Sequence, residues 1–157
     1  MLVTGGVGLV GVMTLADPSP AVRALMQRMR DRSWTIHRWA SGVGQVPEIV
    51  SAVWMWEDGA ADVVVIRSHL MASAYRAMPC VDCWEPAAVT LWDMAAPEKI
   101  LREVLGWEPY GEEGRRREAV RPLPGLVLPL AARQRLTQYI DLPHLPEPIV
   151  VPPIPVF

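Results

Sequence analysis

The apolar residues of the chain gather most densely between Ile49 and Arg67, in two runs separated by Glu57-Asp58-Gly59. The runs Val50 to Trp56 and Val63 to Ile66 are rich in Val, Ile and Trp, which suit a pleated and packed surface. An Asp-Gly pair tolerates the positive φ angles of a tight reversal, so the two runs are predicted to pair as an antiparallel hairpin. Neither run alternates cleanly between apolar and polar positions, which indicates that both faces of the hairpin are covered.

Helical periodicity appears on either side of the hairpin. Residues 19–32 and 97–105 repeat their apolar side chains every three or four positions. Ser19 and Pro20 suit the start of the first helix, and Gly106 suits the end of the second. Both segments are therefore predicted to be amphipathic helices.

Shorter elements are expected between and beside these helices. Strands are predicted at residues 33–39 and 89–92, while residues 68–78 fit either a short helix or a continued strand. We therefore expect a compact α+β domain over residues 18–107. Its core is predicted to be a small antiparallel sheet of about four strands, packed with two or three helices.

The composition changes outside this domain. Residues 1–17 form a glycine-rich apolar leader, and residues 108–122 form a linker whose opposite charges largely balance. Residues 123–157 form an apolar, proline-rich C-terminal segment with a short helix expected at 131–140 and an extended tail after it. Because this tail is apolar, we expect it to lie over its own domain or to dock on another protein. Both alternatives stay open.

A glycine-rich motif stands near the N-terminus. Residues 4–11, TGGVGLVG, resemble the T-G-G-x-G-x-x-G turn of extended short-chain dehydrogenases. The resemblance implies an NAD(P) site formed by the backbone of Gly5, Gly6, Gly8 and Gly11, where a pyrophosphate would lie close to a helix N-terminus. The catalytic Tyr-x-x-x-Lys of that family is absent, because none of the three tyrosines has a lysine four residues on.

A second motif, Pro79-Cys80-Val81-Asp82-Cys83, resembles half of the signature of zinc-dependent nucleoside and nucleobase deaminases. That family also needs a His-x-Glu or Cys-x-Glu, and neither His37 nor His69 is followed by such a glutamate. A structural zinc site on Cys80, Cys83 and His69 is one hypothesis, and a pair of ordinary reduced cysteines in a loop is the simpler one.

Overall composition narrows the function classes. Net charge is −2, which gives no general attraction to nucleic acid. No run approaches the roughly 20 apolar residues that cross a bilayer, so no membrane span is expected. Two cysteines are too few for a disulfide framework, and the start lacks a basic signal region, so a cytoplasmic location is predicted.

Apolar surface is abundant while no motif completes an active site. The sequence therefore favours a non-catalytic protein-interaction or assembly module without a cofactor, with NAD(P) binding or zinc binding as the alternatives. Its contacts with another protein or another copy are predicted to involve an apolar sheet face and the proline-rich tail. The candidate contact residues are Trp54, Trp56, Trp92, Ile154 and Phe157.

Overall fold

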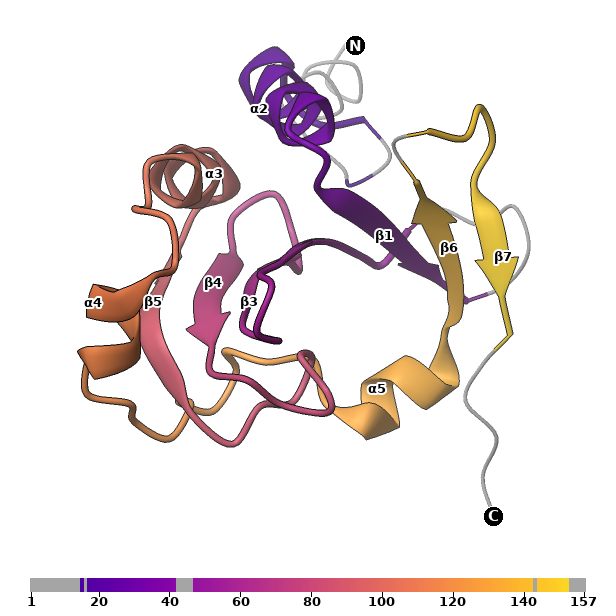
Figure 1. Ribbon diagram of the computed structural model, residues 1–157. Coiled ribbons are helices and arrows are strands. Elements are labelled where there is room, and N and C mark those ends of the chain that lie inside the picture. The colour runs from indigo at the N-terminus through magenta and orange to yellow at the C-terminus, as the bar shows by residue number, and fades with distance from the viewer. Residues whose placement is uncertain (1–14, 16, 42–46, 143, 153–157) are drawn as a thin grey trace, which may run out of the picture.

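The structure, a computed structural model, describes residues 15, 17–41, 47–142 and 144–152 (Figure 1). Its elements in chain order are α2 (Pro20–Asp31), β1 (Thr35–Ala40), β2 (Ile49–Met55), β3 (Ala61–Ile66), β4 (Ala72–Ala77), β5 (Val89–Ala95), α3 (Pro97–Leu105), α4 (Glu112–Arg116), α5 (Leu130–Arg135), β6 (Thr137–Asp141) and β7 (Ile149–Val151). All strands join one antiparallel sheet in the order β5-β4-β3-β2-β1-β6-β7.

The predicted hairpin forms strands β2 and β3 at the centre of this sheet. Val50 pairs with Ile66 and Met55 with Ala61, and Gly59 in the turn has a φ of 90°, a conformation that glycine adopts without strain. Successive residues of β3 point to opposite cores, with Val63 and Val65 on one side and Val64 and Ile66 on the other. The consecutive apolar residues of β3 are therefore buried on both faces of the sheet, as expected.

The prediction of about four strands and two or three helices is wrong. The sheet has seven strands, and the described residues contain four helices. The additional strands come from residues 72–77 and from residues 137–151, where the end of a short helix over 131–140 and then an extended tail were expected. Strand β6 is specified by pairing with β1, far earlier in the chain, which local sequence patterns do not encode. Strands β4 and β7 pair with their neighbours in the chain.

Strand β4 shows how pairing overrides local spacing. Residues 68–78 place apolar side chains at helical intervals, but every residue of β4 is buried between β3 and β5. Ala72 and Ala74 are small enough to lie beneath the helices, while Tyr75 fills the opposite core. The helix expected there is replaced by its alternative, a strand.

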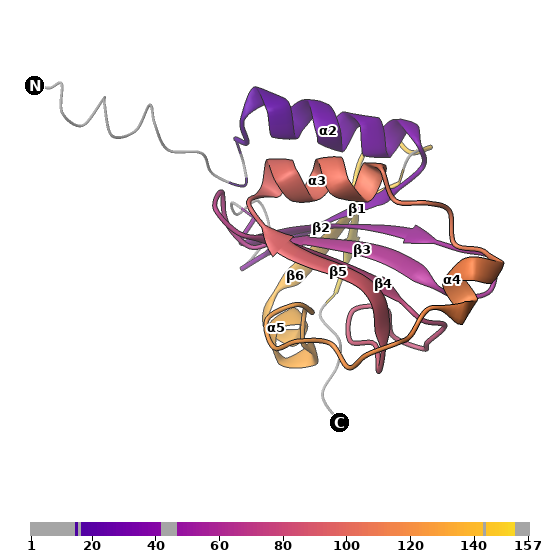
Figure 2. The ribbon, with the colours of Figure 1, turned by 90° about the vertical axis from the view of Figure 1, so that its left-hand side faces the viewer.

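Helices α2 and α3 cover one face of the sheet, lying side by side (Figure 2). The Ser19 hydroxyl accepts a hydrogen bond from the Val22 amide at 3.2 Å, so α2 begins with the predicted cap. Val22, Leu25, Met26 and Met29 of α2 and Ile100, Leu101 and Val104 of α3 are buried against the sheet. Both helices are confirmed.

The chain itself also covers the opposite face, where α5 lies (Figure 2). Leu126, Leu128 and Leu136 are fully buried there against Val63, Val65 and Tyr75. The Ser73 hydroxyl donates to the Leu126 carbonyl at 2.7 Å, which fixes this irregular segment on β4. A second piece of cover, residues 80–84, is fixed by the Tyr75 hydroxyl, which donates to the Cys83 carbonyl at 2.7 Å.

A buried arginine joins the two pieces of this cover. Arg133 of α5 donates to the Leu128 carbonyl at 3.1 Å and lies 2.7 Å from the Asp82 carboxylate. Asp82 belongs to the loop after β4, so the ion pair connects that loop with the C-terminal half. Residues 80–85 and 126–136 thus act together as the second layer, which we call the C-terminal cover.

A second buried ion pair holds the segment that follows α3. Asp62 and Arg76 face each other on β3 and β4, and the guanidinium makes two hydrogen bonds of 2.7 and 2.8 Å to the carboxylate. Arg76 also donates to the Glu108 carbonyl at 2.7 Å. The rings of Trp56, Trp107 and Tyr110 surround its guanidinium at 5.5 to 5.9 Å.

Replacing Arg76 with Met keeps much of the side-chain volume but leaves the Asp62 carboxylate buried without its partner. We expect Arg76→Met to lower the free energy of unfolding by about 3 kcal/mol, measured by urea denaturation, because an uncompensated buried charge is costly. Arg102→Met is the matched control, since it removes an exposed pair with Glu98 and should change stability by less than about 0.5 kcal/mol. Equal effects of the two substitutions would show that Arg76 is not a structural anchor.

Candidate functional site

The predicted aromatic contact residues do not form one surface. Trp54 and Trp56 lie near the end of β2 on the helix side, where they are half-buried and their ring centroids are 5.9 Å apart. Trp34 packs against Trp54 at 6.5 Å, so the rings of this cluster pack against one another, while the buried indole nitrogens of Trp54 and Trp56 have no hydrogen-bond partner among the described residues. Trp92 of β5 is exposed and pairs with Tyr75, on the opposite side of the sheet.

Several other candidate residues fall outside the part of the chain that the structure describes. They are Gly5, Gly6, Gly8 and Gly11 of the predicted dinucleotide site, and Ile154 and Phe157 of the predicted contact surface. The dinucleotide site therefore stays a prediction.

The structure separates His69 from the two cysteines. His69 precedes β4 and Cys80 follows it, so a six-residue strand, roughly 20 Å long, lies between them. No group of three or more potential metal ligands occurs among the described residues. Zinc binding through Cys80 and Cys83 stays a prediction, and His69 is not positioned to join them.

The electrostatic surroundings of both cysteines favour the neutral thiol. Burial raises the pKa of Cys83 to about 11, with further contributions from Cys80 and the Asp82 carboxylate. Burial, together with Asp82, also raises the pKa of Cys80. Because disulfide exchange needs the thiolate, these surroundings disfavour thiol exchange at neutral pH.

His37 lies in an aromatic cluster beneath the C-terminal cover. Its ring is 4.9 Å from that of Trp84 in an edge contact and 6.4 Å from that of Trp39 in a stacked one. Its Nδ1 accepts a hydrogen bond from the Gln138 amide at 2.7 Å, which leaves the ring proton on Nε2. Burial lowers the pKa of His37 to about 4, so the ring is neutral and serves to join β1 and β6.

The largest departure from the sequence prediction is the C-terminal hairpin, residues 137–152, which we call the arm. Strand β6 pairs with β1, and β7 pairs with β6 at the edge of the sheet. Thr137, Tyr139 and Ile140 are typical strand residues and were the available signal, but they were assigned to a short helix over 131–140, and the following prolines indicated a polyproline tail. In the structure Pro148 and Pro152 simply bound the three-residue strand β7.

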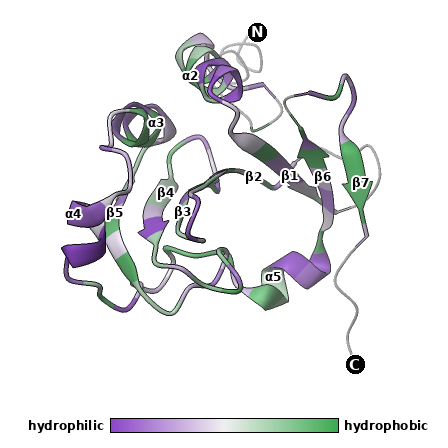
Figure 3. Cartoon of the chain, in the orientation of Figure 1, coloured by the Kyte–Doolittle hydropathy of each residue, from purple (hydrophilic) through white to green (hydrophobic). Residues whose placement is uncertain are grey.

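The arm carries exposed apolar side chains on both of its faces. Ile149 is 42% exposed and Val150 is 52% exposed, and their side chains point to opposite sides of the strand. Figure 3 shows β7 as one of the most apolar segments at the edge of the sheet. Within the described part of the chain, the arm therefore lies beyond α2, α3 and the C-terminal cover and has no comparable cover of its own.

Two arginines hold the base of the arm in place. The Asp141 carboxylate at the end of β6 lies 2.7 Å from Arg38 of β1 and 3.4 Å from Arg30 of α2. Asp141 is only 16% exposed, so these charge-assisted contacts are partly shielded from water. The arm is thus a fixed feature of the fold at its base.

Comparison with protein-family models, with curated proteins and with solved structures finds no match. Among the described residues, no helix has the length and apolarity needed to cross a membrane.

The pKa of His37 predicts a pH dependence of stability. The folded value, about 4, lies below the usual value of 6.5, so the unfolded chain takes up the proton first as the pH falls. The contribution is complete above about pH 6.5 and is lost progressively down to about pH 4. We expect the free energy of unfolding to fall by about 2 kcal/mol between pH 7 and pH 5 because of His37 alone.

Urea denaturation of the wild type and of His37→Gln at both pH values measures this contribution. Glutamine does not titrate, so the variant should lose that part of the pH dependence while keeping the contribution of every carboxylate. An identical pH dependence in the two proteins would show that His37 is not buried in its neutral form.

Proposed function

We propose that this protein is a non-catalytic self-assembly module whose contact surface is the arm and whose partner is a second copy of the chain. The single observation that supports this is the exposure of Ile149 and Val150 on an edge strand while both faces of the sheet are covered by the chain itself. An edge strand offers unpaired backbone groups as well as apolar side chains, so it is suited to pairing with another strand.

The proposal moves the contact surface away from the sheet faces that the sequence favoured. One face is taken up by α2 and α3 and the other by the C-terminal cover. Trp54 and Trp56 pack within the first of these layers, so they are poor anchors for a partner. The proline-rich segment keeps its proposed role, because the arm belongs to it.

Strand β7 can pair with β7 of a second copy of the chain without an electrostatic penalty. Antiparallel pairing about a two-fold axis at Val150 places Ile149 of one copy opposite Val151 of the other. None of these three side chains is charged, so the pairing of two identical strands places no like charges opposite each other. Pro148 and Pro152 lack backbone donors and limit the pairing to this short stretch.

The opposite edge of the sheet is less open, which favours a closed dimer over a growing chain. Val89 of β5 exchanges two backbone hydrogen bonds of 2.8 Å with Val120, so part of that edge is already paired. The proposal requires no cofactor. It includes a cytoplasmic location, supported by the two free cysteines.

Size-exclusion chromatography with light scattering and native mass spectrometry test the proposal on the full chain. We expect a concentration-dependent dimer that Val150→Asp weakens at least tenfold, because the substitution buries two like charges at the centre of the contact. Leu70→Asp is the matched control. Leu70 is 70% exposed in the turn between β3 and β4, so the same change there should leave the dimer intact.

A wild-type protein that stays monomeric at the highest soluble concentration would overturn the proposal. Equal weakening by Leu70→Asp and Val150→Asp would also overturn it, since the effect would then come from net charge. Circular dichroism and thermal unfolding of each variant establish that the compared proteins are folded.

A further inference from the structure

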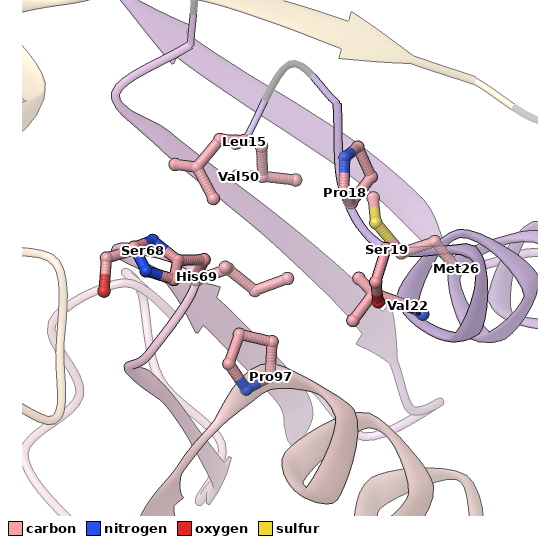
Figure 4. Close-up of a pocket in the computed structure, with 10 residues that line it drawn as sticks. Leu15, Pro18, Ser19, Val22, Met26, Val50, Ser68, His69 and Pro97 are labelled. Atoms are coloured by element: carbon pink, nitrogen blue, oxygen red, sulfur yellow. Dashed lines mark hydrogen bonds between the residues drawn. The ribbon is translucent and has the colours of Figure 1, made fainter. Parts of the chain in front are cut away.

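A hollow beneath α2 combines an apolar end with a cationic end. At the apolar end, a cavity of about 20 Å³ lies between the start of α2, strands β2 and β3, the turn after β3 and the start of α3 (Figure 4). Figure 4 shows Val22 and Met26 on one side of this space and His69 and Pro97 on another. The space is large enough for one small group, and its mostly apolar walls give a water molecule few partners.

A larger hollow of about 360 Å³ adjoins this cavity. The two share Leu15, Pro18, Met26 and Val50, so these side chains form a common apolar wall. The larger hollow adds three arginines, Arg23 and Arg30 from α2 and Arg38 from β1. A ligand lying along the common wall would therefore meet apolar side chains at one end and guanidinium groups at the other.

The arginines at this hollow are only partly occupied by their partners. Arg30 and Arg38 share one oxygen of the Asp141 carboxylate, and Arg23 pairs with the exposed Asp17. One carboxylate oxygen thus serves two guanidinium groups, each of which carries five N–H donors, while Asp31 and Glu147 line a neighbouring hollow beside the same two arginines. The side chains of Arg30 and Arg38 are only 29% and 38% exposed, so their attraction for an anion is screened less than at an open surface.

We propose that this hollow binds a small organic monocarboxylate with a short apolar chain. The carboxylate contacts Arg30 and Arg38, whose planar guanidinium groups match its two oxygens, and the chain lies on Met26, Val50 and Pro18. The neighbouring carboxylates of Asp31 and Glu147 favour a monoanion over a doubly charged phosphate, because they repel the second negative charge. The narrow inner cavity limits the apolar part to a short chain.

The site does not include β7, but Arg30 and Arg38 also hold the base of the arm, so the oligomeric state of each variant is measured alongside binding. Hexanoate is the probe, and isothermal titration calorimetry together with amide chemical shifts of the full chain measures its binding. We expect saturable binding with shifts at Met26 and Val50, while acetate and hexanol, which each lack one half of the ligand, bind at least tenfold more weakly.

Arg30→Gln removes one guanidinium while Arg38 still pairs with Asp141, and it should weaken hexanoate at least tenfold, as expected for a lost charge-assisted hydrogen bond. Arg28→Gln is the matched control, because it removes the same charge from the exposed face of α2 outside the hollow. It should leave the affinity unchanged.

Three results would overturn the assignment. The first is the absence of saturable hexanoate binding. The second is equal weakening by Arg28→Gln and Arg30→Gln, which would indicate general charge attraction. The third is binding of inorganic phosphate as tight as that of hexanoate, which would mean that the apolar wall takes no part. Thermal unfolding of both variants checks that the hollow is still formed.

Discussion

The whole fold depends on one constraint, that a sheet with apolar residues on both faces must be covered twice. Val63, Val64, Val65 and Ile66 are buried in succession, so exposure of either face would cost about 2 kcal/mol for each side chain uncovered. The two helices supply only one layer. The C-terminal cover supplies the other, which explains why a largely irregular segment is built into the core.

An irregular segment that covers a sheet has backbone carbonyls without partners in regular secondary structure. Buried arginines donate hydrogen bonds to some of these carbonyls. Arg133 donates to the Leu128 carbonyl while its charge is met by Asp82. Arg76 donates to the Glu108 carbonyl while its charge is met by Asp62. Each arginine therefore fixes a loop through the backbone carbonyl that it binds, and a neighbouring carboxylate neutralises its charge. The main role of these ion pairs is to position the loops.

Because both faces of the sheet are covered, its edge strands are the remaining places where the sheet can contact a partner. The arm extends beyond both covering layers, and β7 keeps an open edge with apolar side chains on both sides. Exposed apolar edges of sheets are normally protected from pairing, and among the described residues Pro148 and Pro152 limit the pairing of this one. The short strand is thus limited in what it can pair with, which is consistent with one small symmetric contact.

Local signals predicted much of the first layer and little of the second. The cap at Ser19, the periodicity of α2 and α3, and the Asp-Gly turn all act within a few residues, so the sequence alone specifies them. Strand β6 depends on register with β1, far away in sequence, and prolines 146 and 148 pointed to an extended tail where β7 forms. Strand β4 pairs with its chain neighbours, but its apolar side chains also fit helical intervals. The separation of His69 from Cys80 likewise follows from β4 and could not be seen before that strand was known.

Disulfide cross-linking at the two-fold axis tests the central claim, that the covered sheet assembles through β7. The experiment introduces Val150→Cys into a chain carrying Cys80→Ser and Cys83→Ser, with Leu70→Cys in the same background for comparison. Residues directly opposite in an antiparallel pair have Cα atoms roughly 4.5 to 5.5 Å apart, within the range that a disulfide spans. The account predicts rapid formation of a covalent dimer at position 150 and slow formation at position 70, whereas equal rates, or no dimer at position 150, would contradict it.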